Sequence, residues 1–284
     1  MRTTVGLERL SVCAHQYELA ESVTPSARTE YPGAMYLGSC FHRAMEFYFR
    51  ERLQGGTPFE DDVIGAFTEA WDSGQPLSDG LTKANVVWAD KLYPNTTEES
   101  SYEDGIGMLK LYLPVASTIE PAQVEFGGKI EVLGEPIVFH IDLLTANNHL
   151  IDLKTGRRTK SQLDADVSIQ LSVYAWGLRK LGIWQPQDET VALHSVVRHQ
   201  RVGKNGKVNP EPYKLTIVES RRNLINYEWM DEVFIPRLIA MKQSKAFPAN
   251  PGTHCAWCPV REHCGHWESV QSGRAETDYV TVDE

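Results

Sequence analysis

The sequence lacks an apolar run long enough to span a membrane, and it lacks an excess of basic residues. A membrane-spanning helix needs about 20 consecutive apolar residues, so none is expected. The N-terminal MRTTVGLERLSVCAH also has no apolar signal region. We therefore expect a cytoplasmic protein that has no membrane as a partner.

Cysteine is scarce, with five cysteines in 284 residues. An odd number of cysteines in a chain without a secretion signal argues against a framework of disulfide bonds. Three of the five lie close together in the segment CAWCPVREHC, residues 255–264. This clustering indicates a metal site.

Acidic residues outnumber basic residues by 38 to 28, which gives a formal net charge of −10. Proteins that bind nucleic acid usually carry a basic footprint, so the balance is unfavourable for such a partner at first sight. Binding depends, however, on the local field of a groove rather than on the summed charge. The C-terminal AETDYVTVDE adds acidic residues that need not belong to any groove. The net charge therefore does not exclude a nucleic-acid partner.

Hydrophobic residues make up 42% of the chain, an ordinary value for a globular protein. The spacing of apolar residues predicts helices over residues 1–20, 38–53, 59–71, 81–92, 99–117, 168–182 and 219–245. Alternating patterns predict three strands between residues 124 and 156, with turns at Gly134–Pro136 and Asn147–Asn148, and two further strands at 191–199 and 213–218. Residues 21–37 and 203–212 are predicted to be loops.

This order of elements predicts a mixed α/β or α+β domain. We expect residues 1–270 to form a single domain, with a helical portion over 38–117 and a sheet core over 122–218. The acidic residues 271–284 are predicted to be disordered.

The segment HIDLLTANNHLIDLKTG, residues 140–156, places Asp142, Asp152 and Lys154 in strongly apolar surroundings. Because side chains alternate along a strand, Asp152 and Lys154 share one face of the later strand. The same rule assigns the faces of the earlier strand, with His140, Asp142 and Leu144 on one and Ile137, Phe139, Ile141 and Leu143 on the other.

The length of the connecting turn decides whether Asp142 and Asp152 can meet. A two-residue turn at Asn147–Asn148 would pair Asp142 with Leu153, whereas a three-residue loop over 146–148 would pair it with Asp152. Asparagine tolerates the positive φ that such a loop needs. A shared site therefore predicts a loop of odd length or a bulge.

Two facing carboxylates repel each other unless a cation lies between them. Carboxylate oxygens suit Mg²⁺, which polarises a phosphoryl oxygen and lowers the pKa of a bound water. A neighbouring lysine can orient that water and neutralise developing charge. The segment thus fits phosphodiester hydrolysis. The alternative is two solvated aspartates and a lysine on a half-exposed sheet face.

The pair ID at 141–142, followed by DLK at 152–154, resembles the signature of the PD-(D/E)XK nucleases, and IDLKTG is similar to their RecB-like branch. GSCFHRAMEF resembles the helix motif of that branch, in which a histidine, here His42, is a metal ligand. QLSVY resembles its Q-x-x-x-Y motif. Two positions depart from the family pattern: Phe139 stands where glycine is frequent, and Ala14 stands where proline is frequent.

The resemblance implies a restriction-endonuclease-like fold, a central mixed sheet flanked by helices. It implies that Mg²⁺ or Mn²⁺ is bound by His42, Asp142, Asp152 and the backbone carbonyl of Leu153, while Lys154 positions the attacking water. Gln170 and Tyr174 are implied to contact DNA or to support the lysine and the metal. Glu125, on the strand before the site, could be an outer acid and is not part of this predicted ligand set.

The implied activity is that of a metal-dependent deoxyribonuclease. Exonuclease action on single-stranded DNA or DNA ends is favoured, and the products carry 5′-phosphates. The implied roles are DNA repair, recombination or CRISPR-like adaptation. A helicase or a recombination or adaptation protein is then a possible partner.

The cysteine spacing C-x2-C-x5-C supplies three ligands, and a four-ligand site needs one more. Zinc completed by His254, His263 or His266 is one solution, and the spacing alone does not separate zinc from an iron–sulfur cluster. Cys13 lies in LSVCAHQYEL, which resembles the N-terminal cysteine motif of the RecB-like branch. That resemblance implies a [4Fe–4S] cluster held by Cys13, Cys255, Cys258 and Cys264, with Cys40 as the spare cysteine beside His42.

Two other functions compete with the nuclease. A non-catalytic iron–sulfur module for DNA binding or assembly in a recombination complex would be expected to lack an aspartate or the lysine, and all of them are present. An iron–sulfur redox protein would need a flavin or nicotinamide motif, and the sequence has none.

Overall fold

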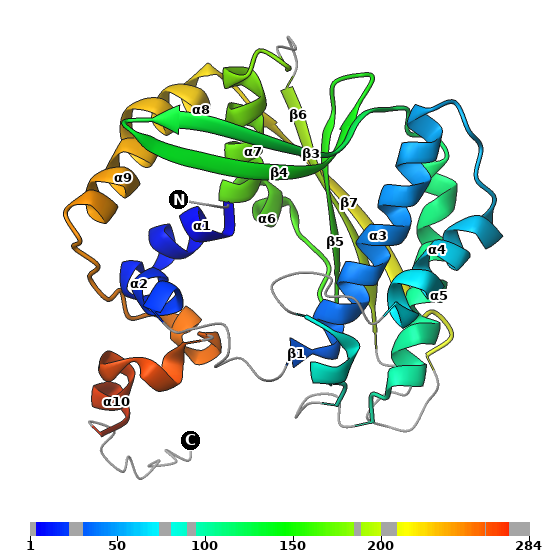
Figure 1. The fold of residues 1–284 in the computed structure, drawn as a ribbon, viewed down its shortest axis with the longest axis horizontal. Helices are drawn as coiled ribbons and strands as arrows, with labels where there is room; N and C mark the ends of the chain where they lie inside the picture. Colours follow the sequence, from blue (N-terminus) through cyan, green and yellow to red (C-terminus); the bar gives the residue numbers. More distant parts are fainter. Residues whose placement is uncertain are drawn as a thin grey trace, which may run out of the picture.

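Figure 1 shows the chain as a computed structural model. The structure describes residues 4–22, 31–73, 81–89, 95–184, 189–199, 209–258 and 260–272. Within these residues, no helix is long and apolar enough to cross a membrane. Most of the predicted disordered tail lies outside the described residues, and its first two residues belong to helix α10 (Gly265–Ser272).

Five strands form a mixed sheet at the centre, in the order β3-β4-β5-β6-β7. Their bounds are Pro121–Val132, Glu135–Thr145, Leu150–Gly156, Glu189–Arg198 and Tyr213–Arg222. Neighbouring strands run antiparallel except β5 and β6, which are parallel. A parallel pair needs a crossover connection, and the helices α6 (Gln162–Asp166) and α7 (Ile169–Lys180) provide it.

One face of the sheet is covered by α3 (Gly33–Leu53), α4 (Glu60–Asp72) and α5 (Glu98–Ala116), which stand together on the right in Figure 1. Apolar residues of α3 recur at helical spacing and are buried. They form one core cluster with strand residues such as Ile151 and Leu153. The sequence of α3 therefore fixes which of its faces meets the sheet.

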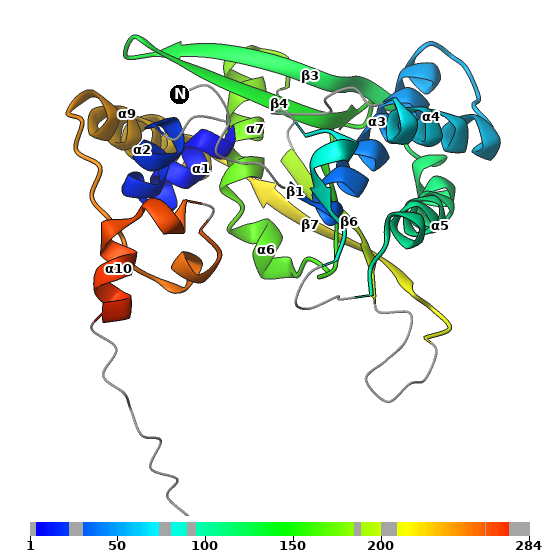
Figure 2. The ribbon, with the colours of Figure 1, turned by 60° about the horizontal axis from the view of Figure 1, so that its bottom comes forward.

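The opposite face is covered by α1 (Thr4–Val12), α7 and α9 (Ile235–Gln243). A second core cluster forms there, in which Leu7 and Leu10 of α1 pack with Phe139 of β4. Figure 2 shows the β3–β4 hairpin reaching over α7 to α9, where Lys242 forms an ion pair with Glu135. The central strands are thus buried on both faces.

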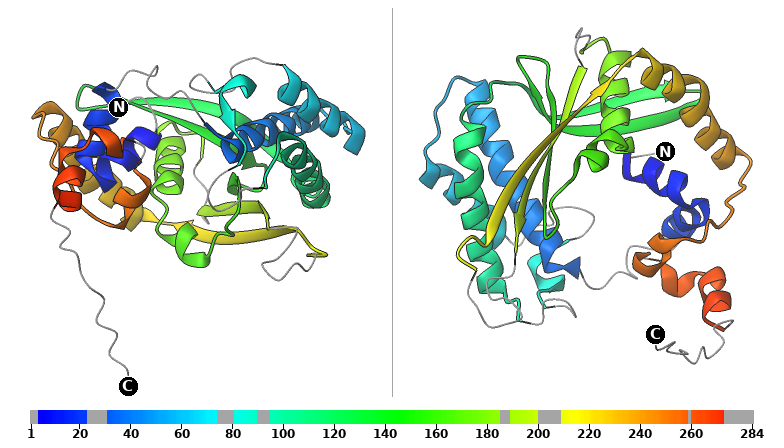
Figure 3. Two further views of the ribbon diagram at one scale, coloured as in Figure 1. Left: turned by 90° about the horizontal axis from the view of Figure 1, so that it is seen from below. Right: turned by 180° about the vertical axis from the view of Figure 1, so that it is seen from behind.

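The two ends of the described chain lie side by side, as Figures 1 and 3 show. The 3₁₀ turns Thr253–Trp257 and Arg261–His263 and helix α10 pack beside α1 and α2 (Ala14–Ser22). The backbone N–H of His15 donates to the carbonyl of Pro248 at 3.3 Å, and the Asn250 side-chain amide donates to the carbonyl of Val12 at 2.8 Å. Hydrogen bonds therefore join segments far apart in the sequence.

The predicted fold class is confirmed, because a five-stranded mixed sheet is flanked by helices. The helix predicted over 81–92 is wrong. Its described part holds a 3₁₀ turn, Lys83–Asn85, and the short strand β2 (Val86–Val87), which pairs in parallel with β1 (Tyr31–Pro32). Trp88 stacks on Trp71 at 5.3 Å between ring centroids, so tertiary packing overrides the apolar spacing.

Two helix boundaries also differ from the prediction. Helix α3 begins at Gly33, directly after the extended Pro32, rather than at Gly38. The helix predicted over 219–245 begins later because β7 extends to Arg222 and Asn223 caps α8 (Leu224–Trp229). A π-helical turn, Met230–Phe234, joins α8 to α9 next to Pro236, which has no backbone N–H to donate.

Candidate active site

The β4–β5 connection has the odd length that a shared aspartate site requires. Leu143 pairs with Ile151 and Leu144 with Leu150, and the N–H of Thr145 donates to the carbonyl of His149 at 3.0 Å. The loop is therefore the three residues 146–148, and Asn148 has a φ of 64° within it. Continuing this register places Asp142 opposite Asp152. Of the two loop lengths considered from the sequence, the structure has the three-residue loop, which is the condition that a shared site required.

The predicted alternation of faces along β4 is wrong at its end. Ile141 and Leu144 belong to the core cluster beside α7, whereas Leu143 belongs to the cluster beside α3. The adjacent strand is irregular at the same level, because Glu125 of β3 has a φ of 48° and pairs with no residue of β4. A left-handed residue turns the local chain, so strict alternation does not hold there.

Glu125, Asp142 and His42 form a group that we call the ligand cluster, since their ligand atoms all lie within 4.8 Å of one another. Nδ1 of His42 lies 3.8 Å from Oδ2 of Asp142. Among the residues that the structure describes, no other His, Cys, Asp or Glu group of three converges as closely. Sequence reasoning predicted two members of this cluster and left Glu125 out.

Hairpin geometry explains how Glu125 reaches Asp142. Val132 pairs with Glu135 across a two-residue turn, and the same register pairs Val124 with Leu143 and Phe126 with Ile141. Glu125 therefore lies opposite Asp142. Counting back from a two-residue turn at Leu133–Gly134 would have found this acid, but the turn was expected one residue later.

His42 reaches the site because α3 approaches β5 closely. A Cβ atom at Gly38 would lie 2.6 Å from Oγ1 of Thr155, so this approach needs glycine. His42 follows one helical turn later and thus faces the same strands. The local contact gives a physical reason for the glycine and the histidine of GSCFHRAMEF.

Asp142 also binds the backbone of the neighbouring strand. Its Oδ2 accepts a hydrogen bond from the N–H of Leu153 at 2.7 Å. The β4–β5 ladder stops after Leu143 and Ile151, so this N–H would otherwise lose its partner. The hydrogen bond orients the Asp142 carboxylate where the two strands separate.

Lys154 is held on the α7 side of the sheet. Its Nζ lies 2.7 Å from Oδ2 of Asp152 and donates to Oε1 of Gln170 at 2.8 Å. The amide nitrogen of Gln170 in turn donates to the hydroxyl of Tyr174 at 2.7 Å. Of the two roles considered for Gln170 and Tyr174, this arrangement favours support of the lysine.

Burial raises the pKa of Asp152 to about 6, against the opposing effect of Lys154. Burial alone would lower the pKa of Lys154, but the carboxylates of Asp152 and Asp142 outweigh burial and raise it. The ammonium form of Lys154 is therefore favoured at neutral pH. A bound cation would stabilise the carboxylate form of Asp152.

The donors of the ligand cluster suit a hard divalent cation. Two carboxylates and one imidazole are available, and Mg²⁺ binds carboxylate oxygens at about 2.1 Å. Ligand atoms that lie within 4.8 Å of one another reach this geometry with small side-chain movements. Asp152 lies outside this group, although its charge interacts with those of Asp142 and His42.

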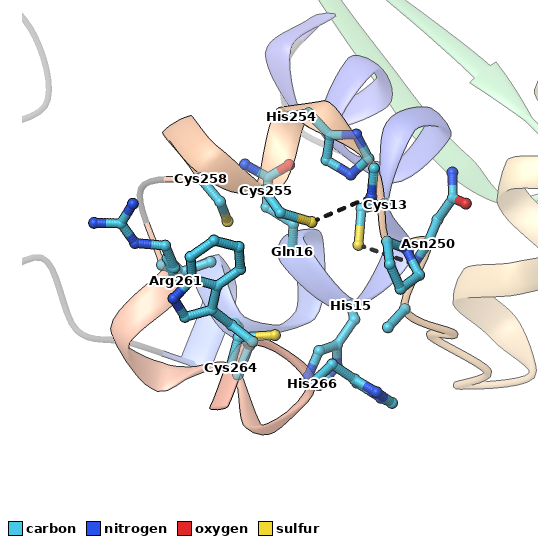
Figure 4. Close-up of a pocket in the computed structure, with 16 residues that line it drawn as sticks. Cys13, His15, Gln16, Asn250, His254, Cys255, Cys258, Arg261, Cys264 and His266 are labelled. Atoms are coloured by element: carbon cyan, nitrogen blue, oxygen red, sulfur yellow. Dashed lines mark hydrogen bonds between the residues drawn. The ribbon is translucent and has the colours of Figure 1, made fainter. Parts of the chain in front are cut away.

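Four cysteines line a separate cavity of about 300 Å³, the cysteine cavity (Cys13, Cys255, Cys258 and Cys264). Figure 4 shows their sulfur atoms pointing into the same space. Backbone N–H groups of Asn250 and Gly252 donate to the sulfurs of Cys13 and Cys255 at 3.4 and 3.5 Å. The fifth cysteine, Cys40, is fully buried in the core beside α3, as expected for a spare.

The spacing of these sulfurs bears on which metal they suit. A tetrahedral zinc site with Zn–S bonds of about 2.3 Å holds its sulfurs roughly 3.8 Å apart. In the described part of the chain, no three of these sulfurs lie within 4.8 Å of one another. Burial raises the pKa of Cys258, and the neighbouring thiolates add to the shift. The four thiols therefore line one cavity, and at least one of them would have to move closer to the others to bind a single zinc ion through three sulfurs.

Comparison with known proteins identifies one family and a dozen similar chains among the solved structures. The sequence profile of the PD-(D/E)XK nuclease superfamily matches residues 4–265. A proposed exonuclease from Eubacterium rectale is 13% identical, with a TM-score of 0.42, over 84% of this chain and 90% of that one. The protein SSO0001 is 14% identical, with a TM-score of 0.36, over 84% of this chain and 87% of its own. None of the curated proteins matches the sequence.

Proposed function

We propose that this chain, which belongs to the PD-(D/E)XK nuclease superfamily, hydrolyses phosphodiester bonds of DNA with the help of a divalent cation. The observation that carries the proposal is the ligand cluster, in which Glu125, Asp142 and His42 come within 4.8 Å of one another beside Lys154. Membership of the family supports a nuclease. DNA as the substrate is the finer proposal.

The cation would be held by His42, Asp142, Asp152 and the carbonyl of Leu153, and we add Glu125 to this set. A bound Mg²⁺ or Mn²⁺ polarises the phosphoryl oxygen and makes a water molecule a stronger nucleophile. Asp142 is fixed for its task by the hydrogen bond from Leu153. Asp152 would offer a further carboxylate oxygen to the cation while its Oδ2 pairs with Lys154.

Lys154 orients the attacking water and stabilises the charge that develops on the phosphate. Gln170 and Tyr174 act through Lys154, because Gln170 accepts from its ammonium and donates to the tyrosine hydroxyl. The water oxygen bonds to phosphorus while the bond to the 3′ oxygen breaks. The products are then a 5′-phosphate and a 3′-hydroxyl.

The resemblance to the RecB-like branch supports an exonuclease that acts on single-stranded DNA or DNA ends. Repair, recombination or CRISPR-like adaptation is the corresponding role. A helicase or an adaptation protein is a partner of the expected kind, since the sequence has no helicase motif that would unwind a duplex.

The cysteine cavity is proposed to hold a [4Fe–4S] cluster. Support comes from four thiols that face one cavity and from the resemblance of the cysteine pattern to that of the RecB-like branch. Backbone N–H groups directed at Cys13 and Cys255 are typical donors to cluster sulfurs. Its role is structural, because it ties residue 13 to residues 255–264.

The test is cleavage of end-labelled single-stranded and double-stranded DNA by protein purified without oxygen, in Mg²⁺, Mn²⁺ or EDTA. Lys154→Ala should abolish cleavage. Lys129→Ala is the matched control, because its exposed side chain pairs with Glu131 on β3 and lies outside the site. The product ladder reports polarity and the chemistry of the ends.

Cleavage that depends on metal and on Lys154 would support the nuclease. A folded, cluster-loaded protein that binds DNA without cleaving it would favour the non-catalytic binding module instead.

A further inference from the structure

The pocket around the ligand cluster is asymmetric. Its volume is about 880 Å³, and one wall is the outer face of α3 on both sides of His42. Toward the C-terminal end of α3, this wall carries Arg43, Glu46 and Arg50. Toward the N-terminal end, it carries no charged residue and consists of Ala34, Met35, Gly38 and Ser39.

The two arginines of the charged half are held by one carboxylate. Nη1 of Arg43 lies 3.0 Å from Oε2 of Glu46, and Nη2 of Arg50 lies 2.9 Å from Oε1 of the same side chain. The Glu46 side chain is 18% exposed, whereas those of Arg43 and Arg50 are 56% and 50% exposed. Glu46 thus orients both guanidinium groups at the surface of α3, and both remain exposed to the pocket.

This arrangement leaves hydrogen-bond donors for a phosphate. A guanidinium has five N–H donors, and Glu46 accepts from only part of each set. The group of three has a net charge of +1 beside an acidic ligand cluster. Arg50 follows His42 by two helical turns, which is about 12 Å along the axis, so it reaches a phosphate beyond the one at the cation.

The uncharged half suits a different part of the substrate. Gly38 lets α3 lie against Thr155, and no cation on this wall could hold a further phosphate. A nucleoside needs only space and apolar contact, and Met35 is 42% exposed there. The two halves therefore match the two sides of a strand that is cleaved near its end.

We propose that the continuing nucleic-acid strand runs over the C-terminal half of α3, where Arg43 and Arg50 bind its phosphates. The terminal nucleotide to be released then lies over Ala34, Met35, Gly38 and Ser39. This inference rests on the proposed nuclease function and specifies how the strand is placed in its site.

The first test is binding of fluorescein-labelled dT20 by anisotropy, with Ca²⁺ in place of Mg²⁺ and salt varied from 50 to 200 mM. Arg43→Gln and Arg50→Gln should each weaken binding by roughly threefold to tenfold and reduce the log–log salt slope by about 0.7. Lys110→Gln is the control, because this exposed lysine of α5 pairs with Glu60 outside the pocket. It should bind as the wild type does.

The second test compares cleavage of dT20 and of the dinucleotide dT2. Arg50→Gln should raise KM for dT20 and leave kcat/KM for dT2 within twofold, because dT2 has no phosphate beyond the scissile one. Arginine variants that bind dT20 as the wild type does, or an equal loss on dT2, would overturn the strand path. A wild type that does not bind dT20 would also overturn it.

These outcomes separate the two proposals. Binding that depends on the arginines without any cleavage in Mg²⁺ or Mn²⁺ would remove the nuclease function and keep the phosphate contacts. If cleavage of dT20 is unchanged in the arginine variants, the proposed strand path is wrong and the nuclease function still stands.

Discussion

The acidic residues and the lysine of the candidate active site lie within about 30 residues of one another on β3, β4 and β5, whereas the cysteine cavity joins two segments far apart in the chain. Asp142 and Asp152 lie on adjacent strands, and their register follows from one short loop. Cys13 and Cys255 are separated by about 240 residues, and a cross-link between them restricts the unfolded chain far more than a short loop does. The first site depends on strand register, and the second depends on distant segments meeting.

The two sites also differ in how the protein prepares them. Oriented hydrogen bonds position Asp142 and Lys154 before any cation arrives. The cysteine cavity is held together by fewer and weaker interactions, which are two long N–H···S contacts and a few hydrogen bonds between the terminal segments. We therefore expect substitutions of active-site residues to lower the rate of cleavage. Substitutions of the cysteines that line the cavity should instead lower the stability of the fold.

The largest expected effect is on stability, from Cys258→Ala. Loss of one ligand should release the cluster, and the chain-entropy model for a loop of about 240 residues assigns roughly 5 kcal/mol to such a cross-link. We expect Tm to fall by roughly 10 °C. Thermal unfolding and visible absorbance of anaerobic protein measure the change.

Cys40→Ala is the control for this prediction, because Cys40 is buried away from the cavity and should leave the visible absorbance intact. An unchanged Tm for Cys258→Ala would contradict a structural role for the cysteine cavity.

Asp142→Asn should show the opposite behaviour. The amide oxygen can still accept from Leu153, so Tm should stay within about 2 °C, while the lost carboxylate weakens the cation site. We expect kcat/KM to fall about 1,000-fold, equivalent to about 4 kcal/mol. Asp61→Asn, on the exposed first turn of α4, should keep wild-type activity. An equal fall in Tm for Asp142→Asn and for Cys258→Ala would contradict this difference between the two sites.

Glu125 offers a finer test, because it combines a ligand role with a left-handed backbone. Glu125→Gln should weaken Mn²⁺ binding by roughly 10-fold to 100-fold. Glu125→Gly should lose the same affinity while relieving the φ of 48°, which stabilises the fold by about 1 kcal/mol or less. Calorimetric titration with Mn²⁺ and urea unfolding separate the two effects. Full Mn²⁺ affinity in Glu125→Gln would remove this residue from the ligand set.

The smallest expected effect is a pH dependence from Asp152. In cation-free protein its pKa is raised to about 6, above an unfolded value of about 3.9, so the folded state holds the proton more tightly. This carboxyl therefore contributes stability below about pH 4, and the contribution is lost as pH rises through 6. In EDTA, Asp152→Asn should gain stability relative to the wild type between pH 5 and pH 7.5. Urea unfolding at both pH values measures the free energy of unfolding of the two proteins. If burial did not raise this pKa, the difference between the variant and the wild type would be the same at pH 5 and at pH 7.5.

From the sequence, the parity of the loop leaves two pairings for Asp142, with Leu153 or with Asp152. Alternation did not predict the faces of the two aspartates, because it breaks in β4 near Asp142 and Asp152 lies outside the ligand cluster. The spacing of the three clustered cysteines predicts a metal site by itself, whereas Cys13 enters the predicted set only through the resemblance to the RecB-like branch.

Other features depended on contacts that no local pattern contains. The segment 81–92 has helical spacing, but Trp88 is taken up by the aromatic packing around Trp71. Glu125 follows from the register of the β3–β4 hairpin once the turn is placed at Leu133–Gly134, but its left-handed backbone is not indicated by its residue type. The exchange of Leu143 and Leu144 between the two cores follows from the same irregularity.

The loop over 146–148 has a consequence for how a gene of this kind can change. Strand β5 pairs with β6 at seven positions, from Leu150 to Gly156, and this pairing fixes the direction of Asp152 and Lys154. An inserted codon in the loop would therefore lengthen the turn and leave both side chains in place. Heritable length variation should be tolerated at this turn, because the loop contributes no side chain to the ligand cluster.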